Sequence, residues 1–294
     1  MTITETPINY EDIQLKYNKL NYPIPCDKHL PKNYFVSLFI GSRGSGKSYC
    51  IVNLLKHYEQ CGIYDPITKE KVAQRIILFS PTYLANPVFK SLKYLSEDDI
   101  VNNYSDEALL EKVDDVENEK DNTERYKTLM KVYKKFLNVK HIDELSHDEL
   151  IELSLLEFEQ PEEPKYPHGC VVFMIFDDLI GSDAFKQTGK SALTNLVLKN
   201  RHMRINILCA TQNLRAIPKS IRTNTSLFVI FKFASKKIIL EDLHTEISNT
   251  LTIEKFEELY EYATEDEHDC LVIDFTNPKQ ERFKKNFKSV LNIS

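Results

Sequence analysis

The sequence lacks several features that would place the protein in a membrane or outside the cell. It has no run of 18 apolar residues, the length that a membrane-spanning helix requires. Residues 1–11 are polar and contain no apolar core of a signal peptide. The six cysteines show no C-x-x-C spacing, and the eight histidines show no spacing typical of metal ligands. We therefore expect a soluble, non-secreted protein with no membrane partner, disulfide framework, zinc site or structural metal.

Acidic residues are missing from a long stretch of the second half of the chain. No Asp or Glu occurs between Ala184 and Leu240. By contrast, residues 91–164 hold 9 Lys/Arg and 21 Asp/Glu, a net charge of −12, so the formal net charge of −6 averages two opposite regions. A positive stretch of this kind favours a polyanionic partner. Its eleven basic residues are Lys186, Lys190, Lys199, Arg201, Arg204, Arg215, Lys219, Arg222, Lys232, Lys236 and Lys237.

One glycine-rich motif is present in full. Residues Gly41-Ser42-Arg43-Gly44-Ser45-Gly46-Lys47-Ser48 fit the phosphate-loop pattern G-x-x-x-x-G-K-[ST], in which backbone N–H groups point at the phosphates of a nucleotide. We expect Lys47 to reach the β and γ oxygens as a catalytic group and the Ser48 hydroxyl to ligate Mg²⁺. The apolar run 34–40 precedes the motif, and apolar residues recur at helical spacing over 51–58. This strand–loop–helix context predicts a site for ATP and Mg²⁺.

The distribution of apolar runs predicts an α/β fold. Continuous apolar runs suit strands that are buried on both faces of a parallel sheet, and helical connections between them favour a doubly wound, mainly parallel sheet flanked by helices. We expect an N-terminal arm over 1–30 and a phosphate-loop ATPase domain over 31–294. Further strands are expected at 75–80, 170–176, 205–210, 227–231 and 270–275.

A charged segment interrupts this pattern. Residues 91–160 have a helical pattern with many acidic residues, and they end at the breakers Pro161 and Pro164. We predict an acidic helical insertion carried on the sheet. A solvated helical hairpin is the favoured interpretation, and a specific binding role is the alternative.

Polar residues follow two of the expected strands. Asp177 and Asp178 come directly after the apolar residues 172–176, at the carboxyl end of a strand, where ligands bind in open α/β sheets. This is a Walker B pattern, which predicts that Asp177 holds Mg²⁺, usually through water, and that Asp178 is the general base. A paired Asp also starts ordinary turns. Gln212, at the end of the next strand, is a candidate to sense the γ-phosphate and orient water, although strand-end glutamines are usually only solvated.

The order of these motifs resembles that of the DNA-packaging ATPases of large cytoplasmic DNA viruses and virophages, within the FtsK/HerA superfamily. The resemblance extends from about Tyr34 to Phe275 and does not cover the arm or the insertion. It rests on the phosphate loop, the strand ending Ile175-Phe176-Asp177-Asp178-Leu179, Asn200-Arg201-His202, Thr211-Gln212, residues 217–224 and the tail 255–274.

The resemblance implies a RecA-like core that assembles into a homo-oligomeric ring and pumps double-stranded DNA into a preformed capsid. Its implied partners are capsid or portal-vertex proteins, and its implied locations are viral factories in the host cytoplasm and the virion. It also implies an arginine finger donated across the subunit interface, worth about 10³ to 10⁵ in turnover in GTPases. Arg222 is the first candidate because of its place in the loop 218–224, with Arg201 and Arg215 as rivals. An arginine there suits a DNA phosphate equally well.

We therefore expect an ATP-driven DNA translocase whose ATP hydrolysis is stimulated by DNA. The alternative is a nucleotide-gated assembly or scaffold factor that moves nothing. A terminase is disfavoured because only about 20 residues follow Asp274, and a metabolite kinase because no acceptor-site lid is evident. The second Gly-Lys-Ser, in 188–191, lacks the earlier glycine, since Ala184 holds that position. We expect it to start a helix, with Lys190 facing DNA.

Overall fold

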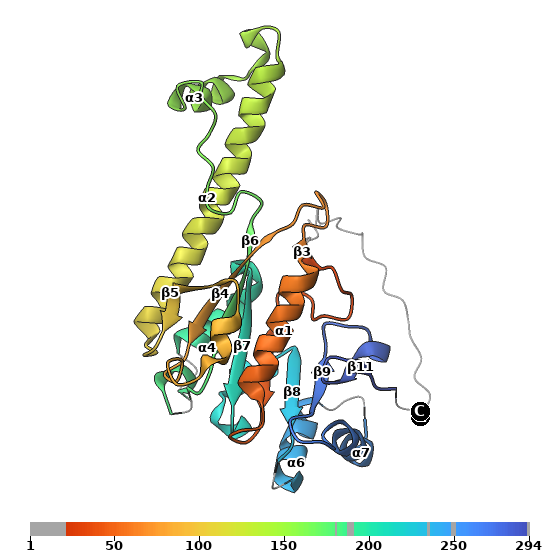
Figure 1. Ribbon diagram of the computed structural model, residues 1–294. Helices are drawn as coiled ribbons and strands as arrows, with labels where there is room; N and C mark the ends of the chain where they lie inside the picture. The colour runs from red at the N-terminus through yellow and green to blue at the C-terminus, as the bar shows by residue number, and fades with distance from the viewer. Residues whose placement is uncertain (1–21, 180, 187–190, 234–235, 248–250, 293–294) are drawn as a thin grey trace, which may run out of the picture.

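The computed structural model describes residues 22–179, 181–186, 191–233, 236–247 and 251–292. Among these residues, nine strands form one sheet with the order β11-β10-β9-β8-β2-β7-β6-β4-β5 (Figure 1). Six strands are mutually parallel: β2 (Val36–Ile40), β4 (Ala73–Phe79), β5 (Leu95–Val101), β6 (Cys170–Phe176), β7 (Ile205–Thr211) and β8 (Leu227–Phe231). The antiparallel strands β9 (Cys270–Asp274), β10 (Phe283–Lys285) and β11 (Ser289–Val290) extend the sheet beyond β8. The mainly parallel sheet expected from the sequence is confirmed.

Helices cover both faces of this sheet. One face packs against α1, and the other packs against α4, α6 and α7. The bounds of these helices are α1 (Lys47–Cys61), α4 (Ala192–Met203), α5 (Lys219–Thr223), α6 (Lys236–Ile247) and α7 (Ile253–Ala263). Short 3₁₀ turns lie at Pro87–Ser91, Ile142–Glu144, Asp183–Phe185, Leu214–Ala216 and Lys279–Glu281. The expected core of a parallel sheet flanked by helices is therefore present.

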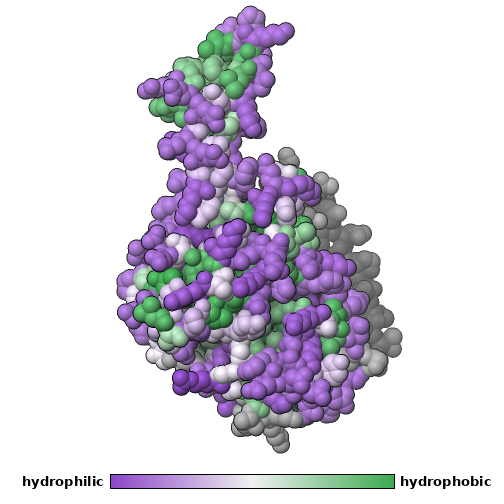
Figure 2. All heavy atoms as spheres, viewed as in Figure 1, coloured by the Kyte–Doolittle hydropathy of each residue, from purple (hydrophilic) through white to green (hydrophobic). Residues whose placement is uncertain are grey.

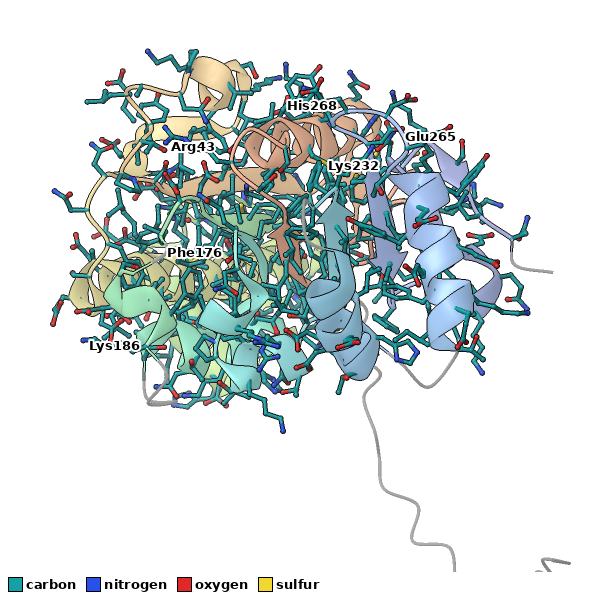
Figure 3. The ribbon with its side chains drawn as sticks, turned by 90° about the horizontal axis from the view of Figure 1, so that it is seen from below. Arg43, Phe176, Lys186, Lys232, Glu265 and His268 are labelled. Atoms are coloured by element: carbon teal, nitrogen blue, oxygen red, sulfur yellow. The ribbon has the colours of Figure 1, made fainter. Side chains whose placement is uncertain are left out.

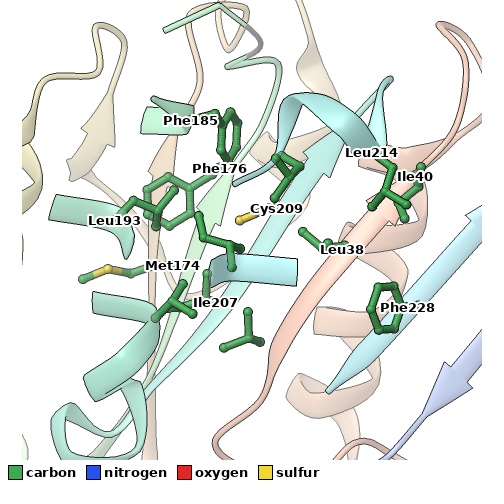
Figure 4. Packing of buried hydrophobic residues seen from close by; sticks show 14 of the residues in the cluster. Leu38, Ile40, Met174, Phe176, Phe185, Leu193, Ile207, Cys209, Leu214 and Phe228 are labelled. Atoms are coloured by element: carbon green, nitrogen blue, oxygen red, sulfur yellow. The ribbon is translucent and has the colours of Figure 1, made fainter. Parts of the chain in front are cut away.

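The continuous apolar runs are explained by this layering. Successive side chains of a strand point to opposite faces. In β2, Leu38 and Ile40 belong to the core cluster on the α4 side, and Phe39 belongs to the cluster on the α1 side. Figure 4 shows the first of these clusters, where Leu38 lies beside Phe228 of the neighbouring strand β8. A central strand must therefore be apolar at nearly every position.

The charged insertion forms an arm, but it starts later than the sequence suggests. The helical expectation is confirmed for α2 (Asp106–Asn138) and α3 (His147–Leu155) and is wrong for Leu95–Val101, which is the edge strand β5. Three polar residues of this strand, 96–98, are exposed, whereas Asp99 is buried and accepts hydrogen bonds from Arg75 of β4. An edge strand tolerates such charges on its exposed side, so its sequence lacks the apolar run that marks the central strands.

We call residues 106–159 the α2–α3 arm. Its root is packed on the domain, because Leu109, Val113 and Val116 are buried in the core cluster that contains α4. Beyond the root, α2 projects away from the sheet, and α3 folds back against α2 (Figure 1). Apolar side chains gather at the far end (Figure 2). The exposed ones there are Leu137, Ile142, Ile151, Leu155 and Phe158.

Little of the expected N-terminal arm falls within the described residues, since 1–21 lie outside them. Ile24–Pro25 forms the short strand β1, which pairs antiparallel with β3 (Ile63–Tyr64) after α1. In the part of the chain that the structure describes, no helix has both the length and the apolar character needed to cross a membrane.

Candidate nucleotide-binding site

The phosphate loop lies between β2 and α1, as expected. Gly41 directly follows β2, and a Cβ atom placed on it would come within 2.7 Å of the Cβ atom of Phe231, so only glycine fits there. Gly44 and Gly46 have φ values of 80° and 96°, in the left-handed region that side chains disfavour. Gly46 is also the residue before the first turn of α1. The glycines of the motif are therefore required by the backbone path.

Lys47 folds over this loop. Its Nζ donates hydrogen bonds to the carbonyl oxygens of Gly41, at 2.8 Å, and Ser42, at 2.9 Å. Burial lowers the pKa of Lys47, and the nearby carboxylates Asp177 and Asp178 oppose that shift. The ammonium group therefore lies between the loop backbone and the acidic pair, where it can meet a phosphate.

The two predicted metal ligands are in contact. Ser48 Oγ donates to Asp177 Oδ2 at 3.0 Å, and its distance to Oδ1 is 3.2 Å. Asp177 is only 4% exposed. Burial raises its pKa to about 6, the hydrogen bond from Ser48 lowers it, and the charge of Asp178 raises it further. A hydroxyl and a carboxylate are hard oxygen ligands, so this pair fits Mg²⁺.

Asp178 and Gln212 line the same pocket as Lys47, Ser48 and Asp177. Asp178 is exposed and has a φ of 55°, so the chain turns sharply at the end of β6. Gln212 follows β7, the next strand in the sheet. The structure thus brings together five of the predicted catalytic and metal residues at the carboxyl ends of neighbouring strands, all except the arginine finger.

Two residues of this pocket were not expected from the sequence. Thr82 and Asn86 line it from the loop after β4, and their positions are fixed locally. The Thr82 hydroxyl lies 3.2 Å from that of Ser80, and Asn86 Oδ1 accepts from the Val88 N–H at 3.4 Å. The sequence feature that could have indicated these two residues is their position after the apolar strand β4. This strand pairs with β6, which ends directly before Asp177.

The finger candidates are not among the residues that line this pocket. Arg222, on α5, donates from Nε to the Ile217 carbonyl at 3.1 Å and forms an ion pair with Glu246 of α6. Arg215 pairs with Asp242 of α6, at 2.6 Å. Arg201 is exposed in the last turn of α4. Because a finger acts across a subunit interface, its assignment stays a prediction.

The basic stretch is partly neutralised in the fold. Arg204 pairs with Glu124 of the α2–α3 arm, and Lys186 with Asp183. The Lys232 ammonium donates to the Glu265 carbonyl (Figure 3), and Lys232 lines a hollow together with Arg43 of the phosphate loop. Several basic side chains of the stretch remain exposed to solvent: Lys186, Lys199, Arg201, Lys219 and Lys232.

The second Gly-Lys-Ser falls mostly outside the described residues, which include only its final residue, Ser191. Ser191 Oγ accepts from the Thr194 N–H at 3.2 Å and caps the start of α4. The expected helix start is therefore confirmed, whereas Lys190 is not described.

Comparisons with known proteins give one family and several structures. The model of a family described as Poxvirus A32 protein matches residues 126–274. A structure of the genome packaging NTPase B204 from Sulfolobus turreted icosahedral virus 2, in complex with sulfate, is 15% identical, with a TM-score of 0.45 over 88% of this chain and 98% of that one. The pCW3 conjugation coupling protein TcpA is 16% identical, with a TM-score of 0.39 over 85% and 59%. No curated protein matches this chain.

Proposed function

This chain belongs to the poxvirus A32 protein family, and from that premise we propose that it is an ATP-driven DNA translocase that packages viral genomic DNA into capsids. The observation that carries the proposal is the convergence of Lys47, Ser48, Asp177 and Asp178 around one phosphate loop. The loop and the family match are independent, because the matched residues begin at 126 and the loop ends at 48.

Nucleotide binding is the first step of the proposed mechanism. The N–H groups at the start of α1 and the Lys47 ammonium bind the phosphates. Ser48 and Asp177 would hold Mg²⁺, which neutralises charge on the β and γ oxygens when it is bound. The pKa of Asp177, raised to about 6 by its burial, still leaves this carboxyl mostly ionised at pH 7.5 and able to act as a ligand.

Hydrolysis then depends on a water molecule that the strand ends orient. Asp178 is exposed to the pocket and serves as the general base that accepts the proton of the attacking water. Gln212 holds that water with its side-chain amide. Arg222 of a neighbouring subunit is the proposed finger, which requires it to leave Glu246 and implies a homo-oligomeric ring.

The basic stretch supports DNA as the track, because Lys199, Arg201 and Lys219 are exposed. If about six basic residues meet phosphates, the logarithm of the affinity falls with the logarithm of salt concentration at a slope of about −5. Capsid or portal-vertex proteins as docking partners, and viral factories in the host cytoplasm or the virion as locations, rest on the sequence resemblance.

The deciding experiment is ATP turnover by the full chain with and without double-stranded DNA, at low and moderate salt. Lys47→Ala serves as the blank for contaminating ATPases. We expect DNA to raise turnover and moderate salt to abolish the increase. Turnover that ignores DNA at both salt concentrations contradicts the translocase.

One structural observation favours a second candidate, a nucleotide-gated assembly or scaffold factor. The α2–α3 arm carries Leu155, 72% exposed, and other apolar side chains at its far end, and exposed apolar patches mark interaction sites. In this case ATP controls a partner contact and no DNA moves. The scaffold factor is supported if ATP turnover does not depend on DNA and if turnover is lost whenever partner binding is lost.

A further inference from the structure

A hollow lies beside the phosphate loop. None of the residues assigned to catalysis or to the metal lines this hollow. It has a volume of ≈ 470 Å³ and lies between α1 and two turns, 267–270 before β9 and 286–288 after β10. Pockets for small ligands have volumes of about 300–1,000 Å³ and combine apolar walls with a few polar groups. The hollow therefore has the size of a small-ligand site.

The direction in which a nucleotide leaves the loop points to this hollow. The γ end of a triphosphate bound as proposed would lie toward Ser48, Asp177 and Gln212, which line a pocket on the side of β2 where β7 and β6 lie. The nucleoside is at the opposite end of the triphosphate. The nucleoside would therefore extend toward β8 and β9, on the other side of β2, where the two turns close the hollow. This step rests on the proposed nucleotide-binding function.

The hollow borders the loop. Gly46 lines it, and a Cβ atom on Gly46 would lie only 3.5 Å from the side chain of His268. His268 also lines a second hollow of ≈ 450 Å³, which it shares with residues 42–45 and Lys232. Figure 3 shows His268 beside α1 at the same end of the sheet as Arg43 and Lys232. The phosphate loop and the two hollows therefore meet at His268.

The side chains of α1 give the hollow its chemistry. Tyr49, Asn53 and His57 line it at four-residue spacing, which places them on one face of the helix. Tyr49 is 63% exposed, so its ring offers a large aromatic surface next to the phosphate loop. Cys50 and Leu54 supply the apolar floor. An aromatic surface and an amide are the groups that bind a nucleobase by stacking and hydrogen bonding.

The opposite wall is held in a fixed shape. Asn286 Oδ1 accepts from the Cys270 N–H at 2.8 Å, and Asn286 Nδ2 donates to Asp269. Asp269 also pairs with Lys285 at 2.8 Å. His268 and Asn286 have φ values of 70° and 56°. Such left-handed residues occur where the surrounding structure imposes the turn, often at ligand sites.

We propose that this hollow binds the base and ribose of the nucleotide whose phosphates occupy the loop. The base packs on Tyr49, and Asn53 forms its hydrogen bonds. The turn at His268 covers the opposite side.

The test compares two ligands on the full chain by calorimetry. ATP carries a nucleoside, and inorganic tripolyphosphate presents phosphates alone. We expect Tyr49→Ala to weaken ATP binding about tenfold, the effect of losing one base–aromatic stack, and to leave tripolyphosphate binding unchanged. Asn53→Phe, which fills the hollow, gives the same pattern. Lys47→Ala weakens the binding of both ligands.

The matched control is Tyr262→Ala, because Tyr262 is 62% exposed, nearly the same as Tyr49, but lies on α7. It should leave the affinities for both ligands unchanged. The inference is overturned if Tyr49→Ala and Asn53→Phe leave the ratio of the two affinities at the wild-type value. That result leaves the proposed function intact. If the wild-type chain binds neither ligand, the proposed function and the inference fail together.

Discussion

Replacing Asp177 by Asn should stabilise the protein while it abolishes turnover. The carboxyl of Asp177 is buried, and its pKa rises from 3.8 to about 6 because burial disfavours the charged form. Asn has nearly the same shape and carries no charge. The variant therefore keeps the acceptor for the Ser48 hydroxyl and loses the cost of a buried carboxylate.

The sign and size of this effect follow from the raised pKa. Between pH 3.8 and 6 the native state binds more protons than the unfolded state, so the free energy of unfolding contributed by Asp177 falls as the pH rises. A change of one pKa unit corresponds to about 1.36 kcal/mol. The stability difference between Asp177→Asn and wild type should therefore grow with pH by up to about 3 kcal/mol and level off above pH 6 to 7.

The assay is urea unfolding of both proteins from pH 4 to pH 8, with a chelator present so that no divalent cation contributes. A stability difference that stays constant over this range refutes the argument that Asp177 is ionised in a buried site. In a second series, ATP with Mg²⁺ should raise the stability of wild type more than that of the variant, since only wild type retains the carboxylate ligand.

Three further substitutions test the other assignments. Asp178→Asn should leave ATP affinity within about twofold and reduce turnover by about 10²-fold or more, as expected for the loss of a general base; unchanged turnover in a single-turnover assay contradicts the assignment. An inactive Arg222→Ala subunit should regain turnover when mixed with Lys47→Ala subunits, because a finger acts in trans, and Glu246→Gln, which breaks the same ion pair, should remain active. If the mixed subunits stay inactive and Glu246→Gln also loses activity, Arg222 has a structural role. Gly41→Ala should weaken nucleotide binding and lower the unfolding midpoint, since the methyl group of alanine has no room in the folded loop. A nucleotide affinity equal to that of wild type, measured by calorimetry, contradicts this prediction.

The central strands could be predicted from the sequence because burial on both faces demands continuous apolar runs. The phosphate loop and Asp177 could be predicted because their chemistry fixes residue types at short spacing. The edge strand β5 could not, since its exposed positions carry charges and only Asp99 is buried. The short strands β10 and β11 offer 3 and 2 residues of pattern, too few for a period to be recognised.

Long-range pairings account for the remaining differences. Nothing near Arg222 in the sequence indicates that Glu246, 24 residues later, forms an ion pair with it. Thr82 and Asn86 lie in a loop whose distance from the phosphate loop depends on strand order, which a single sequence does not specify.

The far end of the α2–α3 arm determines how salt affects the association of the protein with itself. The apolar side chains there would let two molecules adhere end to end, but residues 131–159 contain seven Asp/Glu and four Lys, a net charge of −3, so two such ends repel each other weakly at low ionic strength. Salt screens this repulsion and leaves the attraction between apolar surfaces. Rising salt therefore favours adhesion at the far end of the arm, whereas it weakens the proposed binding of DNA by the basic stretch.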